Sequence, residues 1–109
     1  MMSFELPAPI AAYLASVNAK DASTLGDCFS DDAVVHDEAR DYEGVDAIKA
    51  WRLETQAKYN YTMEPLDASV DGNTVKVLAR LTGDFPGSPV ELDYTFVLEN
   101  EKIASLLID

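Results

Sequence analysis

The sequence has few of the residues that build metal centres and disulfides. Its 109 residues include one cysteine, Cys28, and one histidine, His36. A single cysteine forms no intrachain disulfide, which suits a reducing compartment, so we expect a cytoplasmic protein. One histidine and one cysteine are also too few for a typical zinc site, and Asp31-Asp32 is more typical of a turn, so we predict no metal.

Basic residues are scarce as well. Eight lysines and arginines stand against 20 aspartates and glutamates, a formal net charge of -12. This charge repels phosphate backbones and anionic lipid surfaces, which argues against nucleic acid or membrane partners. Lys20, Lys49 and Arg52 are scattered and no glycine-rich phosphate loop precedes a helix, so nucleotide binding is not indicated. The simplest role of so much acid is a solvated surface, and a site for a cationic ligand is the less favoured alternative.

Long apolar runs are absent. The most apolar stretch near the N-terminus, residues 10–17, is far shorter than the ~20 residues of a membrane span. Glu5, Pro7 and Pro9 stand where a signal peptide needs its apolar run. The length suits one domain with a single core, and we predict one domain over residues 1–109.

The first half of the chain carries apolar residues at helical spacing. They predict helices over residues 10–17, 21–29 and 44–59, the second capped by Asp21 and ended by the polar run 30–32. One face of the third helix brings large aromatics together, and it consists of Ile48, Trp51, Thr55 and Tyr59.

The second half of the chain alternates apolar and polar residues with a period of two, which is typical of strands. The expected strands are a first one through Val34 and Val35, one that begins after Asn60, and residues 74–82, 90–98 and 102–108. Asp71-Gly72 is a strong signal for a hairpin turn. Helices first and strands last predict an α+β domain, with about three N-terminal helices packed on a curved, mostly antiparallel sheet.

Three segments carry a resemblance to a known family. They are Asn18-Ala19-Lys20-Asp21, the run F-S-D-D-A at 29–33, and residues 44–51. With the order of the elements, they resemble the nuclear transport factor 2-like superfamily, in particular its SnoaL-like polyketide cyclases and the ketosteroid isomerases. The resemblance covers nearly the whole chain. It implies a cone-shaped fold in which a bent sheet encloses a pocket open at one end, often in a dimer packed through the sheets.

The ketosteroid isomerases imply roles for individual residues. They have a tyrosine five residues before the N-A-x-D element, where this chain has Tyr13, and their general-base aspartate follows the F-x-D-D-A run, where it has Asp37. Their second oxyanion donor falls on Asp93 when counted back from Lys102 without gaps, or on Tyr94 if the turn is one residue shorter. The apolar face of that strand favours Tyr94, but dimerisation through the outer face would also need apolar residues, so both alternatives stay open.

These roles imply proton transfer next to a carbonyl group. Asp37 would be the base, and Tyr13 with Asp93 or Tyr94 would polarise the ketone or enol oxygen. The substrate would be an apolar, carbonyl-bearing small molecule, and the enzyme a homodimer that needs no cofactor. A solvated carboxylate at a strand end is the alternative for Asp37. A non-catalytic ligand-binding or dimerisation module is the alternative for the whole domain.

Four further residues are candidates for the pocket wall. His36 neighbours Asp37, and strand alternation turns it to the opposite face unless a bulge brings the two together. A histidine at the sheet margin bonded to a backbone group is the simpler alternative. Trp51 and Tyr59 lie on the inner helix face, where core and pocket wall coincide. Phe85 lies in the turn 83–89 and is either a lid or a packed loop residue.

Overall fold

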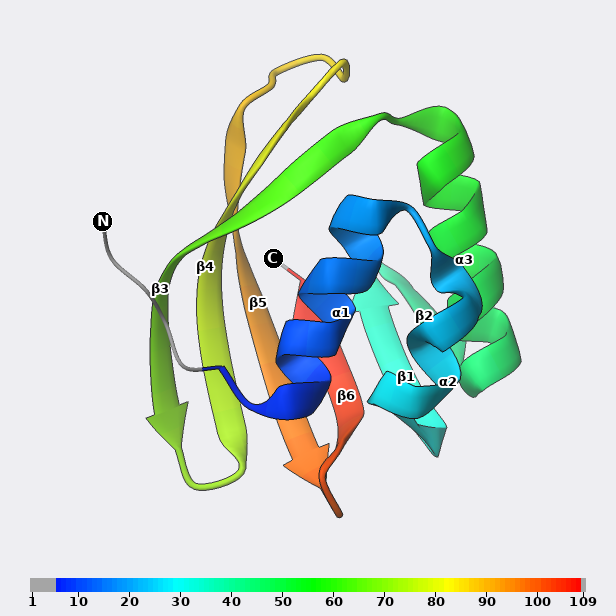
Figure 1. Cartoon of the computed structure of the whole chain (residues 1–109), viewed down its shortest axis with the longest axis vertical. Coiled ribbons are helices and arrows are strands. Elements are labelled where there is room, and N and C mark those ends of the chain that lie inside the picture. Colours follow the sequence, from blue (N-terminus) through cyan, green and yellow to red (C-terminus); the bar gives the residue numbers. More distant parts are fainter. Residues whose placement is uncertain (1–5, 109) are drawn as a thin grey trace.

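The structure is a computed structural model that describes residues 6–108 (Figure 1). Over these residues the chain begins with helix α1 (Ala8–Ala19), a 3-10 turn η1 (Ala22–Thr24) and the short helix α2 (Leu25–Cys28). Helix α3 (Val45–Lys58) follows the first two strands. No helix in this part of the chain is long and apolar enough to cross a membrane.

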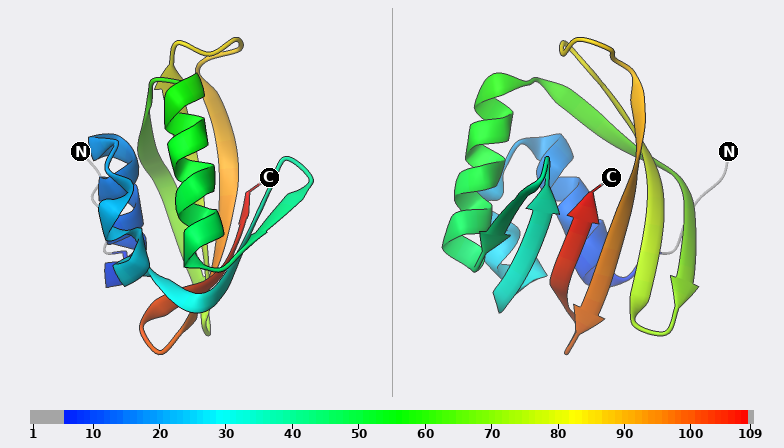
Figure 2. Two further views of the ribbon diagram at one scale, coloured as in Figure 1. Left: turned by 90° about the vertical axis from the view of Figure 1, so that its right-hand side faces the viewer. Right: turned by 180° about the vertical axis from the view of Figure 1, so that it is seen from behind.

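Six strands form one sheet in the described part of the chain. They are β1 (Phe29–Asp37), β2 (Arg40–Glu43), β3 (Tyr61–Asp71), β4 (Thr74–Gly83), β5 (Val90–Glu99) and β6 (Lys102–Ile108). Their order is β2-β1-β6-β5-β4-β3, in which β1 and β6 run parallel and every other neighbouring pair is antiparallel. The sheet bends strongly and the helices lie on one side of it (Figure 2). The predicted α+β fold, three helices on a curved and mostly antiparallel sheet, is confirmed.

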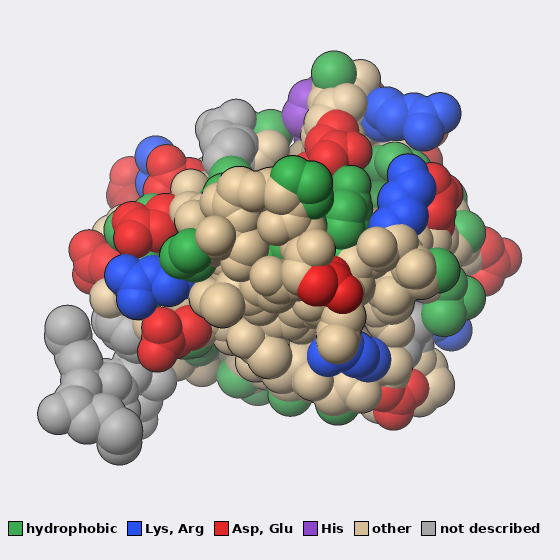
Figure 3. Space-filling view, turned by 90° about the horizontal axis from the view of Figure 1, so that it is seen from above, with side chains coloured by type: hydrophobic (Ala, Val, Ile, Leu, Met, Phe, Trp, Pro, Cys, Tyr) green, Lys and Arg blue, Asp and Glu red, His purple; other side chains and the backbone are tan. Residues whose placement is uncertain are grey.

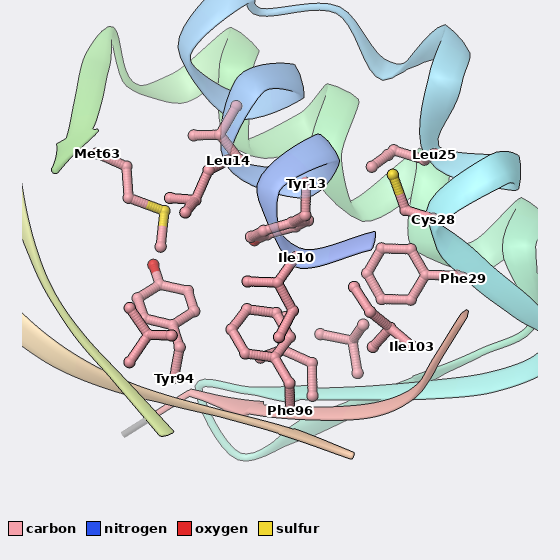
Figure 4. Close-up of a cluster of buried hydrophobic side chains, with 14 of the residues drawn as sticks. Ile10, Tyr13, Leu14, Leu25, Cys28, Phe29, Met63, Tyr94, Phe96 and Ile103 are labelled. Atoms are coloured by element: carbon pink, nitrogen blue, oxygen red, sulfur yellow. The ribbon is translucent and has the colours of Figure 1, made fainter. Parts of the chain in front are cut away.

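The core lies between α1 and the inner face of the sheet (Figure 4). The period of two places alternate residues of β4 and β5 inward, and the buried ones are Val75, Val77, Ala79, Leu81, Tyr94 and Phe96. Ile10, Tyr13 and Leu14 of α1 pack in the same cluster. The rings of Tyr13 and Phe96 meet edge to face with their centroids 5.8 Å apart. Tyr13 therefore joins the helix layer to the sheet.

Strand β1 begins earlier than the sequence predicts. The polar run 30–32 predicts a break, whereas the structure continues these residues as strand from Phe29. The pairing of β1 with β6 shifts register between Phe29 and Val34. An irregularity of this kind accommodates extra residues without ending a strand. Exposed acids alone therefore misplace the start of β1.

The hairpin of β1 and β2 has no signal in the sequence. Glu38 and Ala39 turn the chain between the two strands with φ angles of 52° and 62°. Tight hairpin turns with such backbone angles usually use asparagine or glycine. After β2, Gly44 has a φ of 86°, and its N–H donates to the carbonyl of Ala33 at 2.8 Å as α3 begins. The hairpin places Asp37 at the end of β1, near α3.

Candidate functional site

A cavity of about 410 Å³ lies between α3 and the inner face of the sheet. Its apolar wall comes from β4, the β4–β5 loop, β5 and β6, and consists of Leu81, Phe85, Pro86, Val90, Leu92 and Ile108. Its polar and aromatic lining comes from the end of β1, from α3 and from the sheet, and consists of Asp37, Glu38, Trp51, Arg52, Thr55, Tyr59, Tyr61 and Tyr94. A volume in this range suits a small organic molecule.

Charged side chains on the outside of the molecule do not mark a site in the view from above. On this face basic side chains stand among acidic ones and do not gather into a patch of one sign (Figure 3). This face of the molecule therefore gives no indication of a charged ligand site.

Asp37 is the carboxylate that the sequence predicts for a pocket. It is half-buried and lines the cavity. The indole N–H of Trp51 donates a hydrogen bond to Asp37 Oδ2 at 3.1 Å. Burial raises the pKa of Asp37 above its ordinary value, and the indole hydrogen bond and the charge of Arg52 offset part of this rise. A raised pKa makes this carboxylate a stronger proton acceptor than an exposed aspartate.

Arg52 is a buried guanidinium that the sequence reasoning missed. It is 2% exposed and lines the cavity from α3. Its Nη1 donates a hydrogen bond to Tyr61 Oη at 2.8 Å. The guanidinium carbon lies 5.2 Å from the centroid of the Trp51 ring and 5.8 Å from that of Tyr61. Its Nη2 is buried and has no hydrogen-bond partner among residues 6–108.

Tyr94 and Asp93 lie on opposite faces of β5. Tyr94 is 3% exposed and lines the cavity, whereas Asp93 is exposed and is not among the lining residues. Burial raises the pKa of Tyr94 well above its ordinary value. The phenol therefore stays protonated at neutral pH and can donate a hydrogen bond. Of the two alternatives that the sequence left open, the structure places Tyr94 at the cavity and Asp93 outside it.

Two other candidates lie away from the cavity lining. Tyr13 is 1% exposed and packs its ring against Phe29 and Phe96. Burial raises the pKa of its phenol, which is not among the groups that line the cavity. His36 is exposed and its Nδ1 pairs with the Asp41 carboxylate of β2. The alternation of β1 thus separates His36 from the inward-facing residues, and its partner at the sheet margin is a carboxylate.

The three aromatic residues predicted for the pocket wall, Trp51, Tyr59 and Phe85, all line the cavity. Trp51 is 5% exposed, Phe85 is half-buried, and Tyr59 is 38% exposed at the C-terminal end of α3. Phe85 meets the rings of Tyr59 and Tyr61 edge to face, with centroids 6.1 Å and 6.3 Å apart. The β4–β5 loop is therefore anchored to the helix end and to β3 by aromatic contacts.

A signal for Arg52 was present in the helical spacing. Arg52 is four residues after Ile48 and three before Thr55, so it lies on the same stripe of α3 as Trp51. A charged residue on an apolar stripe is unusual and marks either a buried ion or a helix edge. Tyr61, the hydrogen-bond partner of Arg52, is the first residue of β3, and nothing in the sequence indicates that it contacts α3.

A curved sheet over three helices, with a cavity between them, is the nuclear transport factor 2-like fold. Within this fold class the chain belongs to the SnoaL-like domain family, whose model matches residues 10–105.

Solved structures support the same assignment. The chain is similar to the Sinorhizobium meliloti protein SMa1630, provisionally assigned as a polyketide cyclase, with 38% identity, a TM-score of 0.94 and 100% of each chain covered. A Catenulispora acidiphila protein with a ketosteroid isomerase-like fold, in complex with trimethylamine, shares 22% identity over 96% of this chain and 86% of that one, with a TM-score of 0.84. A protein of unknown function from Cytophaga hutchinsonii, NTF2-like, shares 13% identity over 100% and 93%, with a TM-score of 0.78. The last two show the fold alone. A search among curated proteins found no match.

Proposed function

We propose that the protein is a small-molecule enzyme that moves a proton next to a carbonyl group, as an isomerase or a cyclase does. The observation that carries this proposal is Asp37, a half-buried carboxylate with a raised pKa that lines a largely apolar cavity. The similarity to a protein provisionally assigned as a polyketide cyclase supports the same class of chemistry. The substrate would be an apolar, carbonyl-bearing compound.

The reaction needs a base and a hydrogen-bond donor. The Asp37 carboxylate takes a proton from the carbon next to the carbonyl, and the electron pair of the C–H bond moves to the carbonyl oxygen as an enolate. Tyr94 donates its O–H to that oxygen as charge develops there. Asp37 then returns the proton, either to another carbon in an isomerisation or to the alkoxide formed when the enolate carbon attacks a second carbonyl. In this scheme Tyr13 has a packing role.

A non-catalytic ligand-binding module is the second candidate function. One observation favours it: Tyr13, which the resemblance expects to polarise the carbonyl oxygen, is not among the residues that line the cavity. The fold by itself does not decide between an enzyme and a binding module.

Proton exchange at carbon distinguishes the two candidates. A panel of aryl, cyclic and 1,3-diketones is dissolved in D₂O with the protein, and the loss of the α-proton signals is followed by NMR. Wild type should accelerate exchange for at least one member, and Asp37→Asn should lower that rate by roughly 10²–10⁴-fold. Asp93→Asn is the matched control, because it makes the same change on the outer face, and it should keep the wild-type rate. No acceleration, or equal rates for wild type and Asp37→Asn, would favour the binding module.

A further inference from the structure

Arg52 carries a charge that no described residue balances with an ion pair. It is 2% exposed, and although Nη1 has the Tyr61 hydroxyl as a partner, Nη2 is buried without one in the described chain. A guanidinium stays protonated at any physiological pH, so it does not relieve its burial by losing a proton. Buried charges in proteins are normally paired with an opposite charge and fully hydrogen-bonded.

The groups around the guanidinium supply no anion at hydrogen-bond distance. Asp37 shares the cavity, but none of the ion pairs within residues 6–108 includes Arg52. Tyr94 is a neutral phenol because burial raises its pKa. The faces of Trp51 and Tyr61 stabilise a cation without neutralising it. The cavity wall therefore contains a donor whose natural partner is an anion.

We propose that the cavity binds a ligand that carries a carboxylate, which accepts a hydrogen bond from the Arg52 guanidinium and balances its charge. A carboxylate suits this position because a guanidinium edge offers planar, directed donors to it. The rest of the ligand is apolar, because much of the wall consists of side chains such as Leu81, Val90 and Leu92. Together with the chemistry proposed for Asp37, the substrate class is a small apolar keto acid. This inference rests on the proposal that the cavity binds a small molecule, but it does not require Asp37 to act as a base.

The acidic composition of the chain does not oppose an anionic ligand. Exposed charges are screened beyond ~8 Å at physiological ionic strength, whereas Arg52 acts on a bound carboxylate directly and away from bulk water. A cation such as trimethylamine, which the Catenulispora relative holds, would meet aromatic rings and Asp37 in this cavity. It would also meet the Arg52 guanidinium, which repels a cation and has no ion-pair partner among residues 6–108, so we expect the anion to bind more tightly than the cation.

The test compares ligands that differ in charge and little else. Benzoate is paired with benzamide, and 4-oxo-4-phenylbutanoate with its primary amide. Each compound is titrated by calorimetry into wild type, Arg52→Met and Arg52→Lys, with trimethylamine as the cationic probe. Wild type should bind at least one carboxylate more than about tenfold more tightly than its amide, a difference typical of one charge-assisted hydrogen bond. Arg52→Met should reduce this preference to less than about twofold, and Arg52→Lys should keep part of it.

Four results would overturn the carboxylate assignment: no binding of any carboxylate, no preference over the amides, a preference that survives Arg52→Met, or tighter binding of trimethylamine than of the acids. Circular dichroism checks that each variant is folded, and Arg52→Gln replaces Arg52→Met if the latter unfolds. Asp37→Asn separates the two proposals, because it should lower the rate of proton exchange while it leaves the preference for carboxylates in place. If neutral ketones alone are bound and exchange their α-protons in an Asp37-dependent way, the proposed function stands and the carboxylate assignment is wrong.

Discussion

Replacement of Arg52 by methionine should destabilise the fold less than the loss of a buried, fully paired side chain would. The variant loses a hydrogen bond from a charged donor to Tyr61, worth about 1.5–3 kcal/mol. It also loses the contacts of the cation with two aromatic rings, together worth about 1–3 kcal/mol. It gains relief from the desolvation of an incompletely paired ion, which costs several kcal/mol. Because these effects oppose each other at similar size, we expect a free energy of unfolding within about 2 kcal/mol of wild type.

Urea unfolding, followed by circular dichroism and by the fluorescence of the single tryptophan, measures this difference. Ile48→Ala is the reference on the same helix, since Ile48 is fully buried and its truncation should cost about 2–5 kcal/mol. If Arg52→Met cost as much as Ile48→Ala, the guanidinium would be a satisfied part of the core, and the reasoning from its unused Nη2 would be refuted.

Tyr61→Phe provides the matched control for that result. In the presence of Arg52 it removes the only hydrogen-bond partner of Nη1 among the described residues, so it should cost about 1–3 kcal/mol. In the Arg52→Met background the same change should cost less, because no buried donor is left without a partner. Equal costs in the two backgrounds would show that the two side chains are not coupled.

Because burial raises the pKa of Asp37, the folded state holds that proton more tightly than the unfolded state, and stability falls as the pH rises from the unfolded to the folded pKa. Asp37→Asn should remove this part of the pH dependence and stabilise the protein at neutral pH. Urea titrations at a series of pH values measure the free energy of unfolding of both proteins. If the difference between them were the same at every pH, the raised pKa would be contradicted. A Cβ at Gly83 would lie 2.2 Å from the backbone oxygen of Asn60, which is too close for an unstrained contact. Gly83→Ala should therefore lower the free energy of unfolding, measured by thermal unfolding, by about 1–3 kcal/mol. Gly26→Ala, whose nearest contact would be 3.7 Å away, is its control and should be neutral or stabilising. The homodimer expected from the family resemblance should appear in light scattering, and Leu107→Glu, at an exposed leucine of β6, should shift it to monomer; a monomeric wild type at every concentration would rule the dimer out.

Local periodicity was enough to predict which faces of α3, β4 and β5 point toward the core and the cavity. The stripe of α3 and the alternation of β4 and β5 are repeated signals, and each is reinforced by burial in the fold. They placed Trp51 on the inner face of the helix and favoured Tyr94 over Asp93 for the inner face of β5. Asp37 was identified from the family resemblance, which expects the base after the F-S-D-D-A run, and not from periodicity.

The remaining features depend on tertiary contacts. Glu38 and Ala39 adopt left-handed angles that neither residue favours, because the pairing of β1 with β2 requires them. Tyr13 shares the spacing of a catalytic tyrosine, but the closeness of Phe29 and Phe96 decides that its ring is packed in the core. The helical spacing left Arg52 as either a buried ion or a residue at the edge of the helix, and its contact with Tyr61 at the start of β3 decides that it is buried.

The most direct test of the proposed ligand site uses the single tryptophan. The indole N–H of Trp51 donates a hydrogen bond to Asp37, and the indole ring lies beside Arg52. Because the chain has one tryptophan, this N–H gives one indole signal in a ¹H–¹⁵N spectrum. Addition of 4-oxo-4-phenylbutanoate should move the Trp51 signal in a saturable way in wild type and much less in Arg52→Met. If the indole signal stayed in place while resonances of the outer sheet face moved, the cavity would not be the ligand site.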